Sequence, residues 1–184
     1  MTQGSLFEER ASTLALGLIA GLLVLRVILL IASPLELYAD EAQYWRWGQS
    51  LEWGYYSKPP MIAWVIYFST ALFGDSEWAI RFLAPIFHAV AATVLFALAR
   101  RMFNPLAELF TYLLMPGIIL SSGVISTDGV LFPLWCLALY LFWRLREQEL
   151  GWLGVCVLGI AIGAGFLAKY AMLYFAIGGA LTCL

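Results

Sequence analysis

Hydrophobic residues fill long stretches of this chain, and polar residues gather in the short segments between them. A helix needs about 20 consecutive apolar residues to cross a bilayer core. The pattern predicts membrane-spanning helices over residues 11–32, 78–99, 106–125, 130–143 and 150–168, with an inner turn at Asn104-Pro105 and a bend at Pro116-Gly117. Another apolar segment begins at Ala171 and continues to the last residue. We therefore expect the sequence to be a fragment of a longer protein.

The segment between the first two predicted spans, residues 34–73, is expected to lie at one membrane surface. Residues 40–51 have an amphipathic helical pattern typical of an interfacial helix. Pro59-Pro60 opens another apolar helix, because proline is tolerated in the first helical turn. That helix, Met61–Phe73, extends roughly 20 Å, short of the ~30 Å bilayer core. It can cross obliquely or lie flat.

Positive charge decides between these two topologies. Arg100-Arg101 and Arg144…Arg146 are the clearest basic clusters, and such clusters favour the cytoplasmic side. Both clusters fall on that side only if Met61–Phe73 does not cross the membrane. We therefore expect this helix to lie flat or to re-enter. The outer side then collects most of the remaining ionisable residues, namely Asp40, Glu41, Lys58, Arg81, Asp128 and Lys169.

Composition supports an all-α integral membrane protein. The chain is 63% hydrophobic and 12% charged, with a mean hydropathy of +0.88, whereas soluble domains have about 25% charged residues. A net charge of −2 gives no basic face for nucleic acid.

The three cysteines, Cys136, Cys156 and Cys183, lie in apolar runs and predict no disulfide framework. His88 is the only histidine, which excludes a histidine-rich metal site within this chain. It lies deep in the second predicted span, where we expect a hydrogen-bonded interior histidine rather than a catalytic one.

The polar segment Tyr38–Pro60 carries the candidate chemistry. It combines acidic residues and one lysine with many tyrosines and tryptophans. Aromatic faces pack on the C–H faces of sugars, and amphipathic rings favour the headgroup level of a membrane. Ionisable groups that converge at one interface indicate a functional site. The pattern therefore predicts a sugar-handling site at the membrane surface.

Three motifs add a resemblance to a known family. They are Asp40-Glu-Ala-Gln-Tyr-Trp45, Gly54-Tyr-Tyr-Ser-Lys-Pro-Pro60 and an apolar span that ends in Arg100-Arg-Met-Phe103. Together they resemble the polytopic GT-C glycosyltransferases, in particular the superfamily of protein O-mannosyltransferases and lipid A aminoarabinose transferases. The resemblance covers about residues 18–176, the N-terminal portion of such enzymes. It implies transfer of a sugar from a polyprenyl-phosphate donor to a lipid A, glycan or protein acceptor, on the periplasmic face of a bacterial inner membrane.

The resemblance also implies roles for individual residues. Asp40 and Glu41 would be catalytic, with Asp40 as the acid/base and Glu41 in either a direct or a structural role. The residues expected to bind the donor phosphate or sugar are Tyr55, Tyr56, Lys58, Arg81 and Asp128. The family implies no certain cofactor. Some aminoarabinose transferases carry a metal-binding glutamate where this chain has Ser57, which weakens the case for a divalent metal.

Several of these residues have structural alternatives. Asp40 and Asp128 could each cap a helix, and Lys58 could lie in a solvated loop. Lys169 and Arg26 could extend to the membrane interface, or Arg26 could face the helix bundle and meet an anionic group. Gly159 and Gly163 match a small-residue helix-contact pattern.

The whole chain also has alternatives to an enzyme. It could be a non-catalytic transporter or lipid-binding module, or an inactive truncated remnant. Transporters favour polar residues at the midplane of the membrane, whereas the ionisable residues here gather at one interface.

Overall fold

The computed structural model describes residues 3–102 and 105–182, and helices are the only regular elements in these ranges. This confirms the predicted all-α class. The helices are α1 (Gln3–Ala32), α2 (Ala39–Gly48), α3 (Met61–Phe73), α4 (Glu77–Arg81), α5 (Leu83–Met102), α6 (Pro105–Leu114), α7 (Pro116–Ser121), α8 (Thr127–Arg146), α9 (Trp152–Ala168) and α10 (Met172–Leu181).

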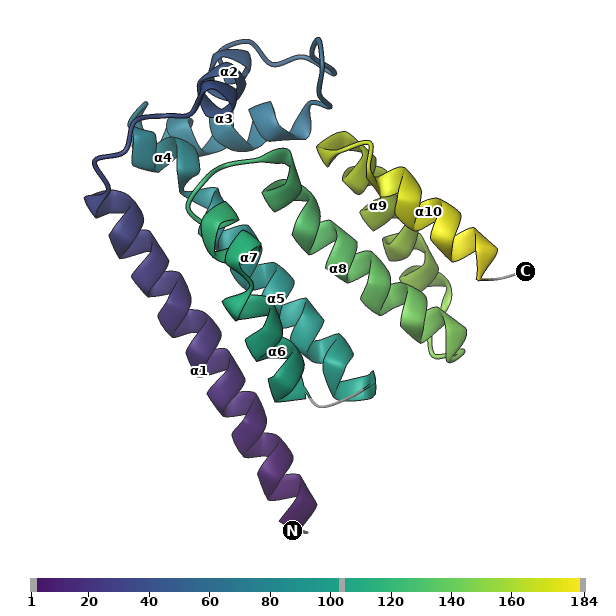
Figure 1. The fold of residues 1–184 in the computed structure, drawn as a ribbon. Helices are drawn as coiled ribbons and strands as arrows, with labels where there is room; N and C mark the ends of the chain where they lie inside the picture. The colour runs from purple at the N-terminus through teal and green to yellow at the C-terminus, as the bar shows by residue number, and fades with distance from the viewer. Residues whose placement is uncertain (1–2, 103–104, 183–184) are drawn as a thin grey trace.

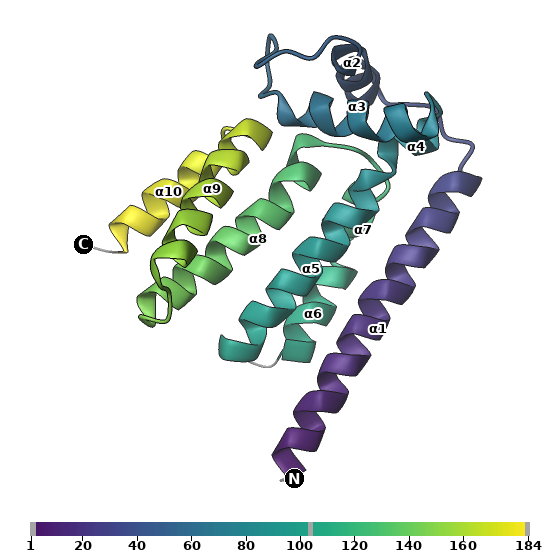
Figure 2. The ribbon, with the colours of Figure 1, turned by 180° about the vertical axis from the view of Figure 1, so that it is seen from behind.

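The long helices run side by side, and the short helices α2, α3 and α4 lie across one end of them (Figure 1). We call this the α2–α3 end. Helix α1 forms one edge of the bundle, while α9 and α10 form the opposite edge in both views (Figures 1 and 2). Helix α3 spans 13 residues and lies crosswise to α1, α5 and α8.

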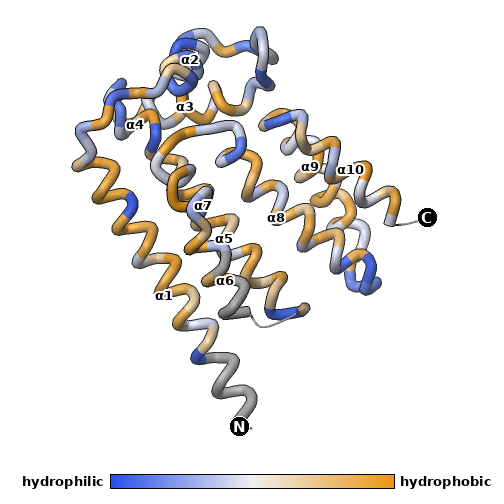
Figure 3. The backbone as a smooth tube through the Cα atoms, in the orientation of Figure 1, coloured by the Kyte–Doolittle hydropathy of each residue, from blue (hydrophilic) through white to orange (hydrophobic). Residues whose placement is uncertain are grey.

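The long helices have the length and composition of membrane spans. Three candidates are Arg10–Ala32, Glu77–Met102 and Thr127–Arg146, and each is strongly apolar. The shorter apolar helices are Met61–Phe73, Trp152–Ala168 and Met172–Leu181. Hydrophobic residues dominate the lengths of the long helices, and hydrophilic residues concentrate near α2 and at the far end of α8 (Figure 3). The chain is therefore an integral membrane protein.

Two predicted spans are interrupted at prolines. The first interruption separates α4 from α5 at Phe82, because Pro85 has no N–H to donate to the Arg81 carbonyl and its ring crowds that carbonyl. The second separates α6 from α7, where Met115 is extended (φ −62°, ψ 124°) immediately before Pro116. The sequence predicted the second bend but not the first. The predicted inner turn at Asn104-Pro105 falls partly outside the described residues.

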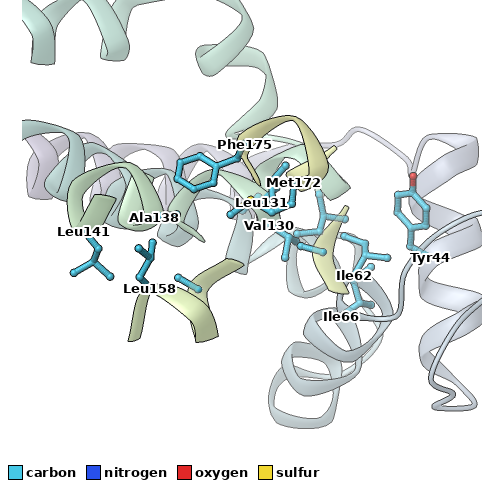
Figure 4. Packing of buried hydrophobic residues seen from close by; sticks show 14 of the residues in the cluster. Tyr44, Ile62, Ile66, Val130, Leu131, Ala138, Leu141, Leu158, Met172 and Phe175 are labelled. Atoms are coloured by element: carbon cyan, nitrogen blue, oxygen red, sulfur yellow. The ribbon is translucent and has the colours of Figure 1, made fainter. Parts of the chain in front are cut away.

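Apolar packing joins the α2–α3 end to the bundle. Tyr44 of α2 packs in one cluster with Ile62 and Ile66 of α3, and with buried residues of α8, α9 and α10 (Figure 4). Gly48 allows the close approach of α2 to α3, since a Cβ there would lie 3.3 Å from the Ala63 carbonyl oxygen. The short helices are therefore packed against the bundle rather than tethered to it only by loops.

The predicted small-residue contact on α9 is wrong in detail. Gly159 and Gly163 lie on an exposed face, and no described atom lies within 4 Å of a Cβ built on either. The close approach is made at Gly165 instead, where a Cβ would lie 2.7 Å from Met172 of α10. Residue 165 lies on the buried face of α9 with Ala161 and Ala168, so the helix uses a different face from the one that the pattern suggested.

The end opposite the α2–α3 end carries an ionic network. Arg101 at the end of α5 contacts Glu149 (2.6 Å) and Glu147 (3.5 Å), and Glu149 also contacts Arg144 of α8 (3.2 Å). Hydrogen bonds from Arg101, then from Arg144, hold the pKa of the Glu149 carboxyl below its ordinary value. The network ties the last turns of α5 and α8 to the loop that precedes α9.

Candidate active site at the α2–α3 end

A buried ion pair lies at the centre of the α2–α3 end. The Arg81 Nη2 atom lies 2.7 Å from Glu41 Oε2, and Arg81 Nε lies 2.9 Å from Glu41 Oε1. Both residues are buried, with 2% and 1% of their surfaces exposed. A two-pronged contact of this kind matches the planar guanidinium to the carboxylate. Substrate cannot reach either side chain in this arrangement.

The ion pair also holds three backbone segments together. Arg81 donates to the carbonyl oxygens of Leu35 (2.9 Å) and Glu36 (2.8 Å) in the loop after α1. Glu41 accepts from the backbone N–H of Tyr38 (3.1 Å) and of Ile125 (2.9 Å), which lies just before α8. This geometry favours the structural alternative for Glu41. The Arg81 guanidinium therefore has few N–H groups left to bind the phosphate of the sugar donor.

Asp40 lies next to Glu41 but in a different environment. It is exposed, and the described part of the chain gives its carboxylate no hydrogen-bond partner. It does not cap α2, because Tyr38 occupies the N-cap position. An exposed carboxylate that is not engaged in a hydrogen bond is free to accept a proton from a substrate.

Tyr44 lies one turn after Asp40 in α2, and it interacts electrostatically with both Asp40 and Asp128. Its ring is buried beside Ile62 and Ile66, and its hydroxyl points away from them (Figure 4). Burial raises the pKa of the Tyr44 hydroxyl, and the nearby carboxylates of Asp40 and Asp128 raise it further. The carboxylates of both aspartates therefore influence the same tyrosine hydroxyl. The sequence pattern alone indicated no specific role for Tyr44 among the many aromatic residues of this segment.

Tyr55 is used to fold the loop after α2. Its ring stacks on Trp47 with centroids 4.9 Å apart and planes 12° apart. Its hydroxyl lies 3.1 Å from the Trp47 carbonyl oxygen and 3.0 Å from that of Ser50, and it accepts from the Glu52 N–H. With these partners, the hydroxyl is less available to a ligand. The geometry therefore favours a structural role for Tyr55.

Tyr56 and Lys58 are the available groups of the same loop. Tyr56 is completely exposed. Lys58 is half-buried, its carbonyl accepts from the Tyr55 N–H (3.2 Å), and buried Pro59 and Pro60 follow it. Its ammonium group contacts no acidic side chain among residues 3–102 and 105–182. A cation fixed at the start of α3 without a counter-charge is suited to bind an anion.

Asp128 and Lys169 form a second ion pair at this end. Lys169 Nζ lies 2.6 Å from Asp128 Oδ1 and 2.7 Å from Oδ2. The side chains are 31% (Lys169) and 54% (Asp128) exposed. The prediction that Asp128 could cap α8 is wrong, because Ser126 is the cap and accepts from the Gly129 N–H at 3.1 Å. The prediction that Lys169 anchors the chain at the interface overlooked this ion pair.

His88 lies in the interior of the bundle, away from these groups. It is fully buried, and its ring nitrogens lie 3.1 Å from the Tyr112 hydroxyl and 3.0 Å from the Ser121 hydroxyl. These contacts join α5 to α6 and α7. The expected interior, hydrogen-bonded histidine is confirmed.

Among the described residues, no group of three or more His, Cys, Asp or Glu side chains lies close enough together to hold a metal ion.

Comparison with known proteins identifies the family. The sequence profile of the dolichyl-phosphate-mannose-protein mannosyltransferases matches residues 57–184. The chain belongs to this mannosyltransferase family. The match includes Lys58, Asp128 and Lys169, and it begins after Asp40 and Glu41. The GT-C resemblance inferred from the sequence motifs is thereby confirmed.

Relatives extend the similarity beyond the region matched by the mannosyltransferase family profile. A lipid A galacturonosyltransferase of Rhizobium johnstonii is 41% identical over 171 residues, which cover 91% of this chain and 36% of that protein. Undecaprenyl phosphate-α-4-amino-4-deoxy-L-arabinose arabinosyl transferases of Pseudomonas fluorescens and Proteus mirabilis are 29% and 27% identical over 84% and 89% of this chain.

The chain thus spans only about a third of the length of these relatives, at 36%, 32% and 33%. No solved structure matches the chain significantly.

Proposed function

We propose that the protein carrying this chain is a membrane glycosyltransferase. It transfers a sugar from a polyprenyl-phosphate donor to an acceptor on the non-cytoplasmic face of a bacterial inner membrane. The relatives are named as transferases of undecaprenyl phosphate-linked aminoarabinose and of lipid A. We therefore favour lipid A as the acceptor, ahead of another glycan or a protein.

One observation carries this proposal. An uncommitted carboxylate, that of Asp40, and two ammonium groups, those of Lys58 and Lys169, lie at the same end of a bundle of apolar helices. Such an end presents both a base and cations to a substrate held in the lipid. A transporter would need these groups near the midplane instead.

The proposed reaction is a single displacement. The acceptor oxygen or nitrogen attacks the anomeric carbon, and Asp40 accepts the proton that it loses. The bond between the anomeric carbon and the phosphate oxygen breaks, and the phosphate leaves with the electron pair. Because attack and departure occur on opposite faces, the anomeric configuration inverts.

The leaving phosphate needs positive charge nearby. Lys58 supplies it at the start of α3. Lys169 supplies a second charge once the donor phosphate competes with Asp128 for it. Tyr56 lies beside Lys58 and can contact the sugar. Glu41 and Arg81 do not touch substrate in this proposal, and they position Asp40 by fixing the start of α2.

Orientation follows from the distribution of arginines. Arg100, Arg101, Arg144 and Arg146 lie at the end opposite α2 and α3, and basic clusters favour the cytoplasm. The α2–α3 end then faces the periplasm. Asp40, Lys58, Asp128 and Lys169 are on that side.

A transfer assay with the full-length protein tests the function. The purified protein is incubated with lipid A and a panel of polyprenyl-phosphate sugars, and sugar-modified lipid A is measured by mass spectrometry. We expect transfer from at least one donor. Binding of donors without transfer to lipid A, glycan or peptide acceptors would favour the lipid-binding alternative instead.

A further inference from the structure

Arg26 interrupts the apolar face by which α1 packs on the bundle. Ala15 and Ile19 are buried on that face against α5 and α6, and Leu22 packs beside them. Continuing by three or four residues places Arg26 on the same face, and buried Leu30 follows it. Arg26 therefore faces the bundle, which decides against the alternative in which it extends from the lipid-facing side.

A groove lies at this position between α1 and α7. Its volume is about 260 Å³. Its lining is mostly apolar, with Arg26 and two serine hydroxyls as the polar side chains. The serines are Ser33 and Ser122, and the apolar lining includes Leu29, Leu35 and Ile119.

Among the side chains that the structure describes, the guanidinium in this groove has no counter-charge. No carboxylate contacts Arg26 in the part of the chain whose side chains are described. Its electrostatic neighbours are Tyr112 and His88, and these two already bond to each other at 3.1 Å. A charged side chain within a span is costly unless an anion or water compensates it.

The Arg26 side chain is also poorly placed to extend to the membrane surface by itself. It lies six residues before the end of α1 at Ala32, or about 9 Å at the rise of an α-helix. Helical side chains lean toward the N-terminus of their helix, which for α1 is away from the α2–α3 end. A headgroup that enters the groove would instead bring the negative charge to Arg26.

We propose that this groove binds the phosphate of an anionic glycerophospholipid. The phosphate lies against the Arg26 guanidinium and accepts a hydrogen bond from the Ser33 hydroxyl, while the Ser122 hydroxyl donates to the Ile119 carbonyl oxygen at 2.8 Å. The acyl chains run along exposed apolar side chains that border the groove, Leu29 of α1 and Ile119 of α7. The site is separate from the proposed donor site, because α1 and α9 form opposite edges of the bundle.

The buried ion pair fixes both sides of the groove. Arg81 bonds to the carbonyl of Leu35, which lines the groove on the α1 side. Glu41 bonds to the N–H of Ile125, two residues after Gly123 on the α7 side. The groove is therefore a preformed feature of the fold.

Its lining favours a phospholipid over the sugar donor. None of the described residues that line the groove is aromatic, whereas the loop that carries Lys58 is rich in tyrosine and tryptophan. The lining offers a phosphate-binding cation and apolar walls but no ring on which a sugar could stack.

Native mass spectrometry of the full-length protein in detergent tests this inference. The protein is titrated with phosphatidylglycerol or, as a zwitterionic control, phosphatidylcholine. We expect one phosphatidylglycerol to be retained preferentially, and Arg26→Gln to weaken its retention about tenfold, as loss of one charge-assisted contact implies. Arg26→Lys should keep most of the preference.

Two further variants separate the groove from general surface charge. Gly123→Leu keeps the charge but fills the groove, and it should also lose the preference, since a Cβ at this position meets only ordinary contacts. Arg46→Gln removes an exposed arginine of α2 outside the groove and should change nothing. Equal retention of both lipids by the wild type, or equal losses in Arg26→Gln and Arg46→Gln, would overturn the proposal. Tighter Arg26-dependent binding of undecaprenyl phosphate, or displacement of the lipid by equimolar inorganic phosphate, would also overturn it.

Discussion

Arg81 and Glu41 form a buried ion pair with an Nη2–Oε2 distance of 2.7 Å, although 40 positions separate them in the chain. Between them they also bond to backbone groups of the loop after α1 and of the loop before α8. A buried ion pair is weak evidence for stability in itself, but a lone buried charge is strongly unfavourable. The two residues therefore work as a unit that organises the α2–α3 end.

Removing one partner of this pair should destabilise the protein. We expect Arg81→Met to lower the free energy of unfolding by about 3–5 kcal/mol, because Glu41 is left buried and uncompensated. Denaturant unfolding in detergent micelles measures the change. Glu77→Gln, at an exposed acidic residue in the first turn of α4, is the control and should have little effect. Wild-type stability of Arg81→Met would contradict this prediction.

Asp40→Asn should abolish sugar transfer without affecting the fold. The amide cannot accept the proton of the acceptor, and loss of a general base reduces kcat by about 10²–10⁴-fold. Polyprenyl-phosphate binding and thermal stability should remain as in the wild type. Glu36→Gln, at an exposed carboxylate four residues earlier, is the matched control. Normal turnover by Asp40→Asn would end the catalytic assignment.

Lys58→Ala should weaken donor binding more than acceptor binding. Loss of one ammonium contact with a phosphate should raise the KM for the donor by about tenfold. Lys169→Ala should act in the same direction. Arg46→Gln controls for net charge, since Arg46 is exposed and lies at the far end of α2. Equal rises in the KM values of donor and acceptor would be evidence against a phosphate role for these lysines.

Thiol labelling should reveal the orientation. In a background in which alanine replaces the native cysteines, Tyr56→Cys should react with an impermeant reagent added to spheroplasts. Glu147→Cys, at the opposite end, should react only after the membrane is permeabilised. The reverse pattern would overturn the proposed topology.

The ionic network at the end of α5 should make stability depend on acidic pH. The pKa of Glu149 is lowered in the folded protein by hydrogen bonds from Arg101 and Arg144. Its contribution is therefore present above the unfolded-state pKa of about 4.3 and is lost as the pH falls through the folded-state value. The Tm deficit of Glu149→Gln at pH 7 should shrink as the pH is lowered below the unfolded-state pKa. A Tm deficit that does not change with pH would show that packing, rather than charge, is lost in this variant.

Local sequence patterns predicted most of the helices, although not the break between α4 and α5. Met61–Phe73 was predicted with the same bounds as observed, because Pro59-Pro60 and Gly74 mark its ends. The bend at Pro116 was predicted as well, since proline constrains the residue before it. These features depend on local chain geometry and on the hydrophobic effect, and both are encoded by neighbouring residues.

Which charged groups are available to a ligand, and which are already paired, depends on the tertiary fold. Asp40 and Glu41 are adjacent and chemically alike, yet one is exposed and the other is buried on Arg81. Likewise, Lys169 forms an ion pair with Asp128, whereas the Lys58 ammonium contacts no acidic side chain among the described residues. Helix phase and the packing of distant segments set these differences, because a charge is satisfied only by the groups that the fold brings within hydrogen-bonding distance.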